Sequence, residues 1–201
     1  MDQATGLRER KKAATRLALH EAALRLAATW GPDRVTVEAI ADAANVSRRT
    51  FSNYFSSKEE ALFHGDTVRL RRMRELIRDQ APGERPWTVL SRAAERLTAE
   101  AYGDPDPAWL AHRRQLRAHP SLLAHHLAAY TTVEREVAAE LASRLTGPDA
   151  ALRSRVLAAS FLAALRVAIQ HWIDHPDGPL LDTIRTALAE ADPAGPPAHR
   201  D

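Results

Sequence analysis

Residues 36–62, TVEAIADAANVSRRTFSNYFSSKEEAL, constrain the fold of this chain more than any other stretch. The first part, VEAIADAA, has apolar residues at helical spacing, and Thr36 stands where an N-cap hydroxyl belongs. Asn45 tolerates the left-handed conformation that lets a chain turn sharply after a helix. The stretch therefore begins with a short helix and a tight turn.

A second short helix follows the turn. Ser47 is a plausible N-cap for RRTFSNYF, in which Phe51 and either Tyr54 or Phe55 face back onto the first helix. The residues left pointing outward are Arg48, Arg49, Thr50, Ser52 and Asn53. This pattern predicts a helix-turn-helix with a second helix rich in hydrogen-bond donors, a shape that enters the DNA major groove. A buried helical hairpin with solvated arginines is the alternative.

A third helix begins directly after the aromatic residues. Ser57 and Glu60 fit a capping box. The run VSRRTFSNYFSSKEEAL, preceded by TVEAIADAANV and by EAALRLAATWG, resembles the N-terminal domain of tetracycline-repressor-type (TetR-family) transcriptional regulators. The resemblance covers residues 8–65, and it implies a DNA-binding domain at this end of the chain.

Candidate DNA contacts follow from the side chains and from the resemblance. Arg48 and Arg49 are predicted to contact bases, because an arginine fork satisfies the two acceptors of a guanine. The resemblance implies phosphate contacts by Thr36, Tyr54 and Lys58, which would fix the register on DNA without reading sequence. The complete predicted set is Thr36, Ser47, Arg48, Arg49, Thr50, Ser52, Asn53, Tyr54 and Lys58.

Composition favours a helical protein of a reducing compartment. The 201 residues include no cysteine, which excludes disulfides and thiolate metal sites and points to the cytoplasm. The N-terminus lacks the apolar region of a signal peptide, and no uninterrupted apolar segment of 18 residues is present, so we expect no membrane partner. Alanine, leucine and arginine dominate over β-branched and aromatic residues, which predicts an all-α fold.

Positive charge is concentrated in the N-terminal part. Residues 1–74 hold 14 of the 28 Lys and Arg residues but only 9 of the 26 Asp and Glu residues. Such an excess suits contacts to phosphates. Five of these cations lie in the first turns of the helix predicted for residues 8–30, where they either reach phosphates beside the groove or form a solvated helix end: Arg8, Arg10, Lys11, Lys12 and Arg16.

The same first helix has a predicted apolar face that ends at Trp30, before Gly31 and Pro32 stop the helix. Members of the resembled family often carry a phenylalanine near Ala27. The methyl group here leaves space that Trp30 is expected to fill.

Prolines and glycines divide the remaining chain into helices, for a total of about nine. The predicted helices run over residues 58–80, 86–102, 107–119, 120–145, 149–172 and 180–191. The expected organisation is a helix-turn-helix domain of three helices over residues 1–65, a helical bundle for ligand binding and dimerisation over 66–192, and a disordered tail over 193–201. The helix over 58–80 would connect the two domains.

The segment LAASFLAALRVAI is apolar almost all round, more than one buried face requires. A helix between its own domain and a second subunit would need this, so we predict a four-helix dimer interface. The predicted interface residues are Phe161, Leu165, Ile169, Trp172, Leu181, Ile184 and Leu188. A fully buried central helix of a monomer remains the alternative, and Arg166 argues against a membrane helix.

A small, apolar ligand is expected in the second domain. The candidate lining is Trp87, Leu90, Tyr102, Trp109, Arg113, Leu116, Leu123 and Tyr130, although aromatic and aliphatic residues of this kind are more often ordinary core than pocket. The stretch from AWLAHRRQLRAHPSLLAHHL to QHWID resembles regulators of the mycofactocin system. That resemblance implies a long apolar ligand such as an acyl thioester, with Arg113, Arg114 or Arg117 available to an anionic head group.

No enzyme motif accompanies these features: no His-Glu-x-x-His, Gly-x-Ser-x-Gly or phosphate loop is present. His125 and His126 are adjacent on a helix, so they point about 100° apart and would not bind one metal ion, and the other histidines are read as surface or capping residues. Neither catalysis nor a metal or other cofactor is therefore expected. The predicted function is a homodimeric, ligand-responsive repressor that binds a palindromic operator in double-stranded DNA. The alternative of a different class is a helical protein-interaction adaptor that keeps the fold without binding DNA. A ligand-binding enzyme is a third possibility, without a supporting motif.

Overall fold

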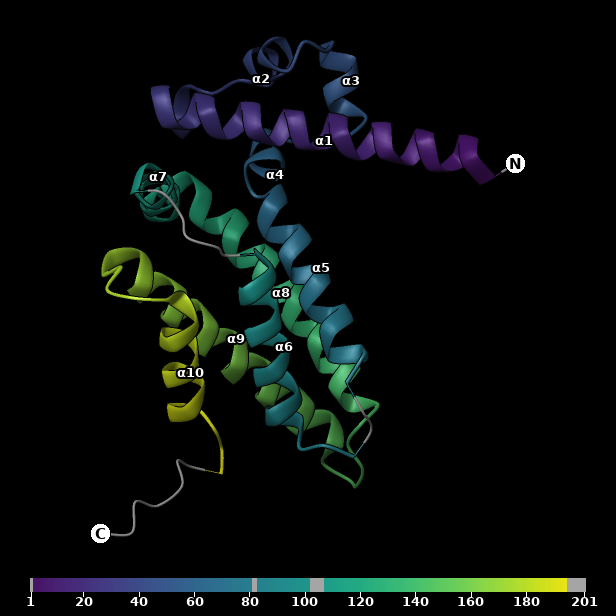
Figure 1. The fold of residues 1–201 in the computed structure, drawn as a ribbon, viewed down its shortest axis with the longest axis vertical. Coiled ribbons are helices and arrows are strands. Elements are labelled where there is room, and N and C mark those ends of the chain that lie inside the picture. Colours follow the sequence, from purple (N-terminus) through teal and green to yellow (C-terminus); the bar gives the residue numbers. More distant parts are fainter. Residues whose placement is uncertain (1, 81–82, 102–106, 195–201) are drawn as a thin grey trace. The chain divides into compact units, whose positions relative to one another are not determined.

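A computed structural model describes residues 2–80, 83–101 and 107–194, and within these residues all regular structure is helical (Figure 1). The elements are α1 (Asp2–Trp30), η1 (Pro32–Arg34), α2 (Val37–Ala43), α3 (Arg48–Ser52), α4 (Lys58–Leu62), α5 (His64–Arg78), α6 (Pro86–Ala101), α7 (Pro107–Ala118), α8 (Pro120–Ala142), α9 (Ala150–Asp174) and α10 (Leu180–Glu190). The all-α prediction is confirmed. Most of the predicted tail, from residue 195 onward, lies outside the described residues.

The chain divides into two compact units. Unit 1 comprises Met1–Thr67 together with Gln115–His126, and unit 2 comprises Val68–Arg114 and Leu127–Asp201. The end of α7 and the beginning of α8 thus belong to the same unit as the helix-turn-helix. The chain passes from one unit to the other three times.

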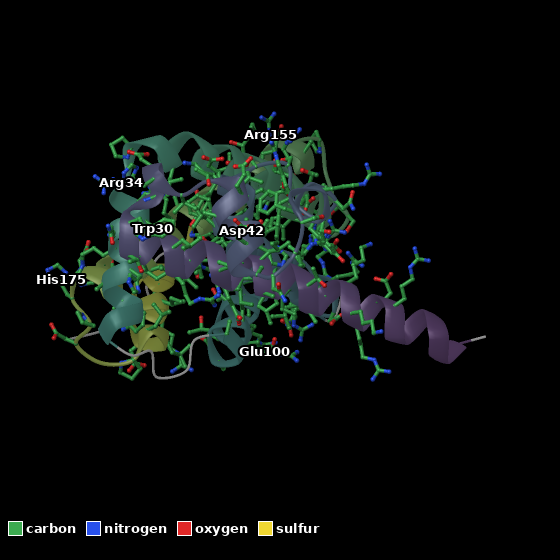
Figure 2. All side chains as sticks on the ribbon, turned by 90° about the horizontal axis from the view of Figure 1, so that it is seen from above. Trp30, Arg34, Asp42, Glu100, Arg155 and His175 are labelled. Atoms are coloured by element: carbon green, nitrogen blue, oxygen red, sulfur yellow. The ribbon has the colours of Figure 1, made fainter. Side chains whose placement is uncertain are left out.

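Unit 1 is built on α1, which begins six residues earlier than predicted and ends where Gly31 takes a positive φ of 79°. Its core gathers side chains from all four N-terminal α-helices and, through Leu116 and Leu122, from the α7–α8 segment. Trp30 does not join this core. Its side chain is 46% exposed at the end of α1 (Figure 2), so the prediction that it fills the space beside Ala27 is wrong.

The helix predicted for residues 58–80 is in fact two helices, which raises the count in the described chain to ten. The break lies at Phe63, whose backbone leaves the helical region (φ −96°, ψ 9°) between α4 and α5. The Phe63 side chain is 95% buried in the core of unit 1. Tertiary packing of this ring outweighs the helix propensity of the surrounding residues.

The core of unit 2 forms where α9 packs against α10 and α6. Trp87 of α6 is buried, and its indole N–H donates to the carbonyl of Leu188 at 3.0 Å. Its ring meets Phe161 of α9 edge to face, with 6.3 Å between the centroids. One aromatic side chain therefore joins all three helices, because its polar atom has a partner while its apolar surface stays buried.

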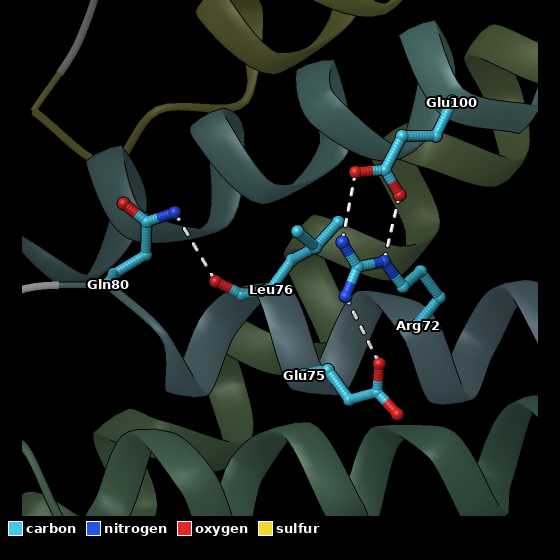
Figure 3. A network of polar contacts seen from close by, with 5 residues as sticks. All are labelled: Arg72, Glu75, Leu76, Gln80 and Glu100. Carbon is cyan, nitrogen blue, oxygen red and sulfur yellow. Dashed lines mark hydrogen bonds and ion pairs between the residues drawn. The ribbon is translucent and has the colours of Figure 1, made fainter.

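Unit 2 also contains an exposed ion network between α5 and α6 (Figure 3). Arg72 donates from Nε and Nη2 to the two carboxylate oxygens of Glu100, at 2.8 and 3.0 Å, and from Nη1 to Glu75 at 3.2 Å. The hydrogen bonds from Arg72 lower the pKa of Glu100 and raise the pKa of Arg72. The bidentate geometry fixes the orientation of α5 on α6 more tightly than a single contact would.

Candidate nucleic-acid interface

The first helix of the helix-turn-helix begins and ends as predicted. The Thr36 hydroxyl accepts a hydrogen bond from the Ala39 backbone N–H at 3.1 Å, which caps α2. Asn45 is in the left-handed conformation with φ 55°, the only non-glycine residue with positive φ in the described chain. The Val46 N–H then bonds the Ala41 carbonyl at 2.9 Å, so the turn satisfies the end of α2 before the chain re-enters a helix.

The second helix, α3, is capped by Ser47. Its hydroxyl accepts from the Thr50 N–H at 3.0 Å and lies 2.8 Å from the Thr50 hydroxyl, so both side chains are engaged locally. Phe51 and Phe55 are buried in the core of unit 1, while Tyr54 is half-buried. The helix is shorter than predicted and ends at Ser52, but its apolar side holds it firmly on the unit.

The outward side of α3 is polar and open. Arg49, Ser52 and Asn53 are exposed, and Arg48 forms an ion pair with Glu38 of α2 at 3.1 Å. The Arg48 and Glu38 side chains are 73% and 55% exposed, so water screens their attraction. The structure thus brings the predicted base-contacting side chains together on one surface and adds the pairing of Glu38 with Arg48.

The three residues predicted to contact phosphates already have partners within unit 1. The Thr36 hydroxyl caps α2, as described above. The Lys58 ammonium donates to the Pro32 carbonyl at 3.0 Å and to the Asp33 carbonyl at 3.3 Å, which ties the start of α4 to η1. Arg16 lies over the Tyr54 ring at 5.7 Å. An ammonium has three donors, so Lys58 keeps one for another acceptor.

The predicted capping box of α4 is formed, with one difference. The Ser57 hydroxyl accepts from the Glu60 N–H at 3.1 Å, as expected. The Glu60 carboxylate reaches back to the N–H and hydroxyl of Ser56, both at 2.7 Å, and not to the N–H of the capping residue itself. The aromatic end of α3 is therefore joined to α4 by a fixed turn.

The predicted ligand-pocket residues do not form one group. Trp87 and Leu90 are buried in the core of unit 2, and Tyr130 packs against it half-buried. Leu116 lies in the core of unit 1, apart from the cluster that holds Trp87 and Leu90, and the common pocket lining stays a prediction. Tyr102 and the side chains of Trp109 and Leu123 lie outside the described residues.

The three arginines considered for an anionic head group differ in their surroundings. Arg114 donates to the Ile173 carbonyl and pairs with Asp174 at 3.3 Å, and thereby caps the C-terminus of α9. Arg113 is 93% buried. The side chain of Arg117 is not among those described. Of the arginines considered for a head group whose side chains are described, Arg113 is thus the more deeply buried.

Most of the predicted dimer-interface residues lie in the interior of their own chain. Phe161, Leu165, Trp172, Ile184 and Leu188 are each at most 7% exposed. Ile169 and Leu181 are half-buried. The five buried side chains therefore have almost no surface left for a partner, whereas Ile169 and Leu181 keep part of theirs.

A different row of apolar side chains is exposed on α9. Leu152, Val156 and Val167 are 64%, 54% and 54% exposed, and Ala163 is exposed between the last two. Steps of four, seven and four residues keep all four on one helix face. This row is an apolar part of the solvent-exposed surface of α9.

By length and composition, α9 is the one described helix apolar enough to cross a membrane, and 44% of its most apolar window is buried in the protein. Core helices meet the same criterion, and α9 contributes eight buried residues to its unit. Among the described residues, no group of three His, Cys, Asp or Glu side chains converges in a way that could hold a metal ion.

An N-capped helix-turn-helix with an arginine-bearing second helix, joined to a helical bundle, defines the class of helix-turn-helix transcriptional regulators. Residues 19–64 match the family model described as "Bacterial regulatory proteins, tetR family", and residues 84–194 match the one described as "MftR C-terminal domain". The chain belongs to the TetR family of transcriptional regulators. Both sequence resemblances are confirmed.

Individual relatives agree with this assignment. The HTH-type transcriptional regulator TcmR of Streptomyces glaucescens is 31% identical over 173 residues, which span 83% of this chain and 76% of TcmR. The crystal structure of Thermus thermophilus FadR, a TetR-family repressor in complex with lauroyl-CoA, is similar with a TM-score of 0.52 and 26% identity over 86% of this chain and 91% of that one. Bacillus subtilis FadR in complex with stearoyl-CoA shares the fold, with a TM-score of 0.52, 19% identity, and coverage of 86% and 95%. All three relatives are named as transcriptional regulators or repressors.

Proposed function

We propose that this regulator is a cytoplasmic, ligand-responsive repressor whose two copies read a palindromic operator through α3. The observation that carries the proposal is the open surface of α3, where Arg48 and Arg49 stand exposed beside Ser52 and Asn53. Two adjacent guanidinium groups on one short helix suit guanine-rich base edges. The neighbouring residues Thr36, Tyr54 and Lys58 would position α3 by contacting phosphates. Ser47 and Thr50 would hold the N-terminal end of α3 in place through their hydrogen bonds to each other.

The proposed dimer surface is the exposed row of α9, Leu152, Val156, Ala163 and Val167. Supporting this choice, three large apolar side chains stand more than half exposed on one face of one helix, where a second copy would cover them. Replacing Val156 by Asp should convert the dimer into monomers. The measurement is sedimentation velocity, with Ala151→Asp as the control, because Ala151 is exposed on the same helix but outside this row.

The proposed ligand is a long apolar chain with an anionic head group, such as an acyl thioester. Two observations support this class: FadR of Thermus thermophilus, 26% identical, was crystallised with lauroyl-CoA, and Arg113, at the edge of the unit 2 segment Val68–Arg114, is 93% buried. Trp87, Leu90 and Tyr130 are the described side chains proposed to flank the acyl chain. Binding would bias one arrangement of the dimer and change the spacing of the two α3 helices.

Selection of bound sites from random DNA is the experiment that tests the DNA-binding part. The expected result is a pair of inverted half-sites whose centres are separated by about one helical turn of DNA or a multiple of it. Recovery of single, unpaired half-sites would contradict the dimer. Recovery of no sites by a folded protein, with no salt-dependent shift of any duplex, would favour the alternative of a protein-interaction adaptor.

A ligand test uses lauroyl-CoA and free CoA as probes in a titration of the protein on a recovered operator. Release by lauroyl-CoA and not by CoA is expected, because only the acyl compound supplies apolar surface to bury. Equal effects of the two compounds would contradict the acyl assignment. Arg113→Gln should raise the concentration needed for release, whereas the matched variant Arg96→Gln, which removes an exposed charge of α6, should leave it unchanged.

A further inference from the structure

The described side chains of the N-terminal half of α1 do not pack into the core of unit 1. In the C-terminal half of α1, Leu19, Ala22, Ala23 and Ala27 form a buried face that packs on α2 and α4. The described side chains ahead of residue 15 are all exposed. A free helix of this length is marginal in water, since most helical stability in proteins comes from packing of one face. This N-terminal half of α1 therefore has a face that no other part of the described chain covers.

Toward the N-terminus, the helix face that is buried in the C-terminal half of α1 changes from apolar to basic side chains. Continuing the buried stripe toward the N-terminus in steps of three or four residues leads from Leu19 to Arg16, Lys12 and Arg8, and Lys11 lies beside them. Arg8, Lys11 and Lys12 are exposed, and in the described part of the chain no ion pair involves any of them. A partner for this face must therefore be anionic and must repeat its charge along the helix axis.

The basic face begins next to α3. Arg16 lies over the rings of Tyr54 and Phe55, with 5.7 and 6.0 Å between its guanidinium carbon and the ring centroids. From there α1 continues past α3 toward the N-terminus in Figure 1, and in Figure 2 its side chains stand clear of the ribbon at the end opposite Trp30. This half of α1 is thus continuous with the surface that is proposed to bind DNA.

We propose that residues 8–16 of α1 form a basic arm that binds the phosphodiester backbone beside the base pairs contacted by α3, which lengthens the protein footprint on DNA. The inference rests on the proposed DNA-binding function. From Arg8 to Arg16 the helix rises about 12 Å, which spans roughly three or four phosphates of one strand. A phosphate row supplies the anionic, periodic partner that the face requires.

The test compares two double variants of the full-length chain. Arg8→Gln/Lys12→Gln removes two charges from the basic face. The control, Arg10→Gln/Arg25→Gln, removes two charges from other sides of the same helix. Glutamine keeps the helix propensity of the replaced residues, so the fold should be retained in both. Circular dichroism verifies that retention before binding is measured.

The measured quantity is the dependence of duplex affinity on salt, with a short duplex of random sequence as the probe. The slope of log Kobs against log salt should become shallower by about 1.8 for Arg8→Gln/Lys12→Gln, since each lost phosphate contact contributes about 0.9, and should stay at the wild-type value for the control. Equal slopes for all three proteins, or an equal change in both variants, would overturn the arm and leave the proposed function standing. A wild-type protein that binds no duplex would overturn both.

Discussion

Replacing Arg48 by alanine gives the sharpest test of how α3 meets DNA. In the free protein the Arg48 guanidinium is paired with Glu38 at 3.1 Å. Base contact therefore requires Arg48 to leave one partner for another. The balance between the two contacts decides whether the arginine reads sequence at all.

The expected free energies favour the contact of Arg48 with a base over its ion pair with Glu38. With side chains 73% and 55% exposed, the Arg48–Glu38 pair belongs to a class that contributes at most about 1 kcal/mol. A bidentate arginine–guanine contact discriminates by about 1–3 kcal/mol. Arg48→Ala should therefore weaken operator binding by about 5-fold to 150-fold and relax the preference at one base pair. Glu38→Gln should tighten binding by up to about 5-fold, because it frees Arg48 and removes a carboxylate near the phosphates.

Fluorescence anisotropy on a selected operator and on single-base variants of it measures both effects. The double variant completes a cycle: the gain from Glu38→Gln should shrink when Arg48 is already absent. Arg96→Ala is the matched control, because it removes one exposed positive charge from α6 and should leave specificity unchanged. Wild-type affinity and unchanged base preference for Arg48→Ala would show that α3 faces the groove with another side.

Three further changes test other contacts. Lys58→Gln should weaken binding to all duplexes alike, make the salt dependence shallower and lower the melting temperature, because the ammonium also holds the carbonyls of η1; an unchanged melting temperature would count against that clamp. Trp87→Phe should cost about 1–3 kcal/mol in chemical denaturation by leaving the Leu188 carbonyl unpaired, and a loss below the error of the measurement would contradict this. The lowered pKa of Glu100 means that its bond to Arg72 stabilises the fold above the ordinary glutamate pKa of about 4.3, and that this stabilisation disappears as the pH falls through the lowered value. Glu100→Gln should accordingly melt earlier than wild type at pH 7 and together with it in strong acid, whereas a constant difference across this range would refute the ion-pair explanation.

Local signals in the sequence predicted the helix-turn-helix well. Thr36, Ser47 and Ser57 cap helices because a hydroxyl there meets the nearest free N–H groups, and Asn45 turns because its short side chain tolerates positive φ. These effects act over three or four residues. They can therefore be read without knowing what the helices pack against.

Features that depend on distant residues were predicted poorly. The break at Phe63 exists because its ring enters a core assembled from other helices. Trp30 lies outside that core, which the pattern of α1 alone does not indicate. Periodicity also showed that α9 has more than one apolar stripe but not which stripe is covered. Phe161 and its neighbours proved to be core, while the row of Val156 proved to be exposed.

The membership of Gln115–His126 in unit 1 has a consequence for the order in which the protein is made. Domains generally fold as units while the ribosome releases the chain from its N-terminus. Here Leu116 and Leu122, which complete the core of the helix-turn-helix unit, are synthesised only after α5 and α6. A nascent chain that ends at Thr67 lacks these two core residues of the helix-turn-helix unit. We therefore expect this unit to be complete, and able to bind DNA, only after the ribosome has released the chain through Leu122.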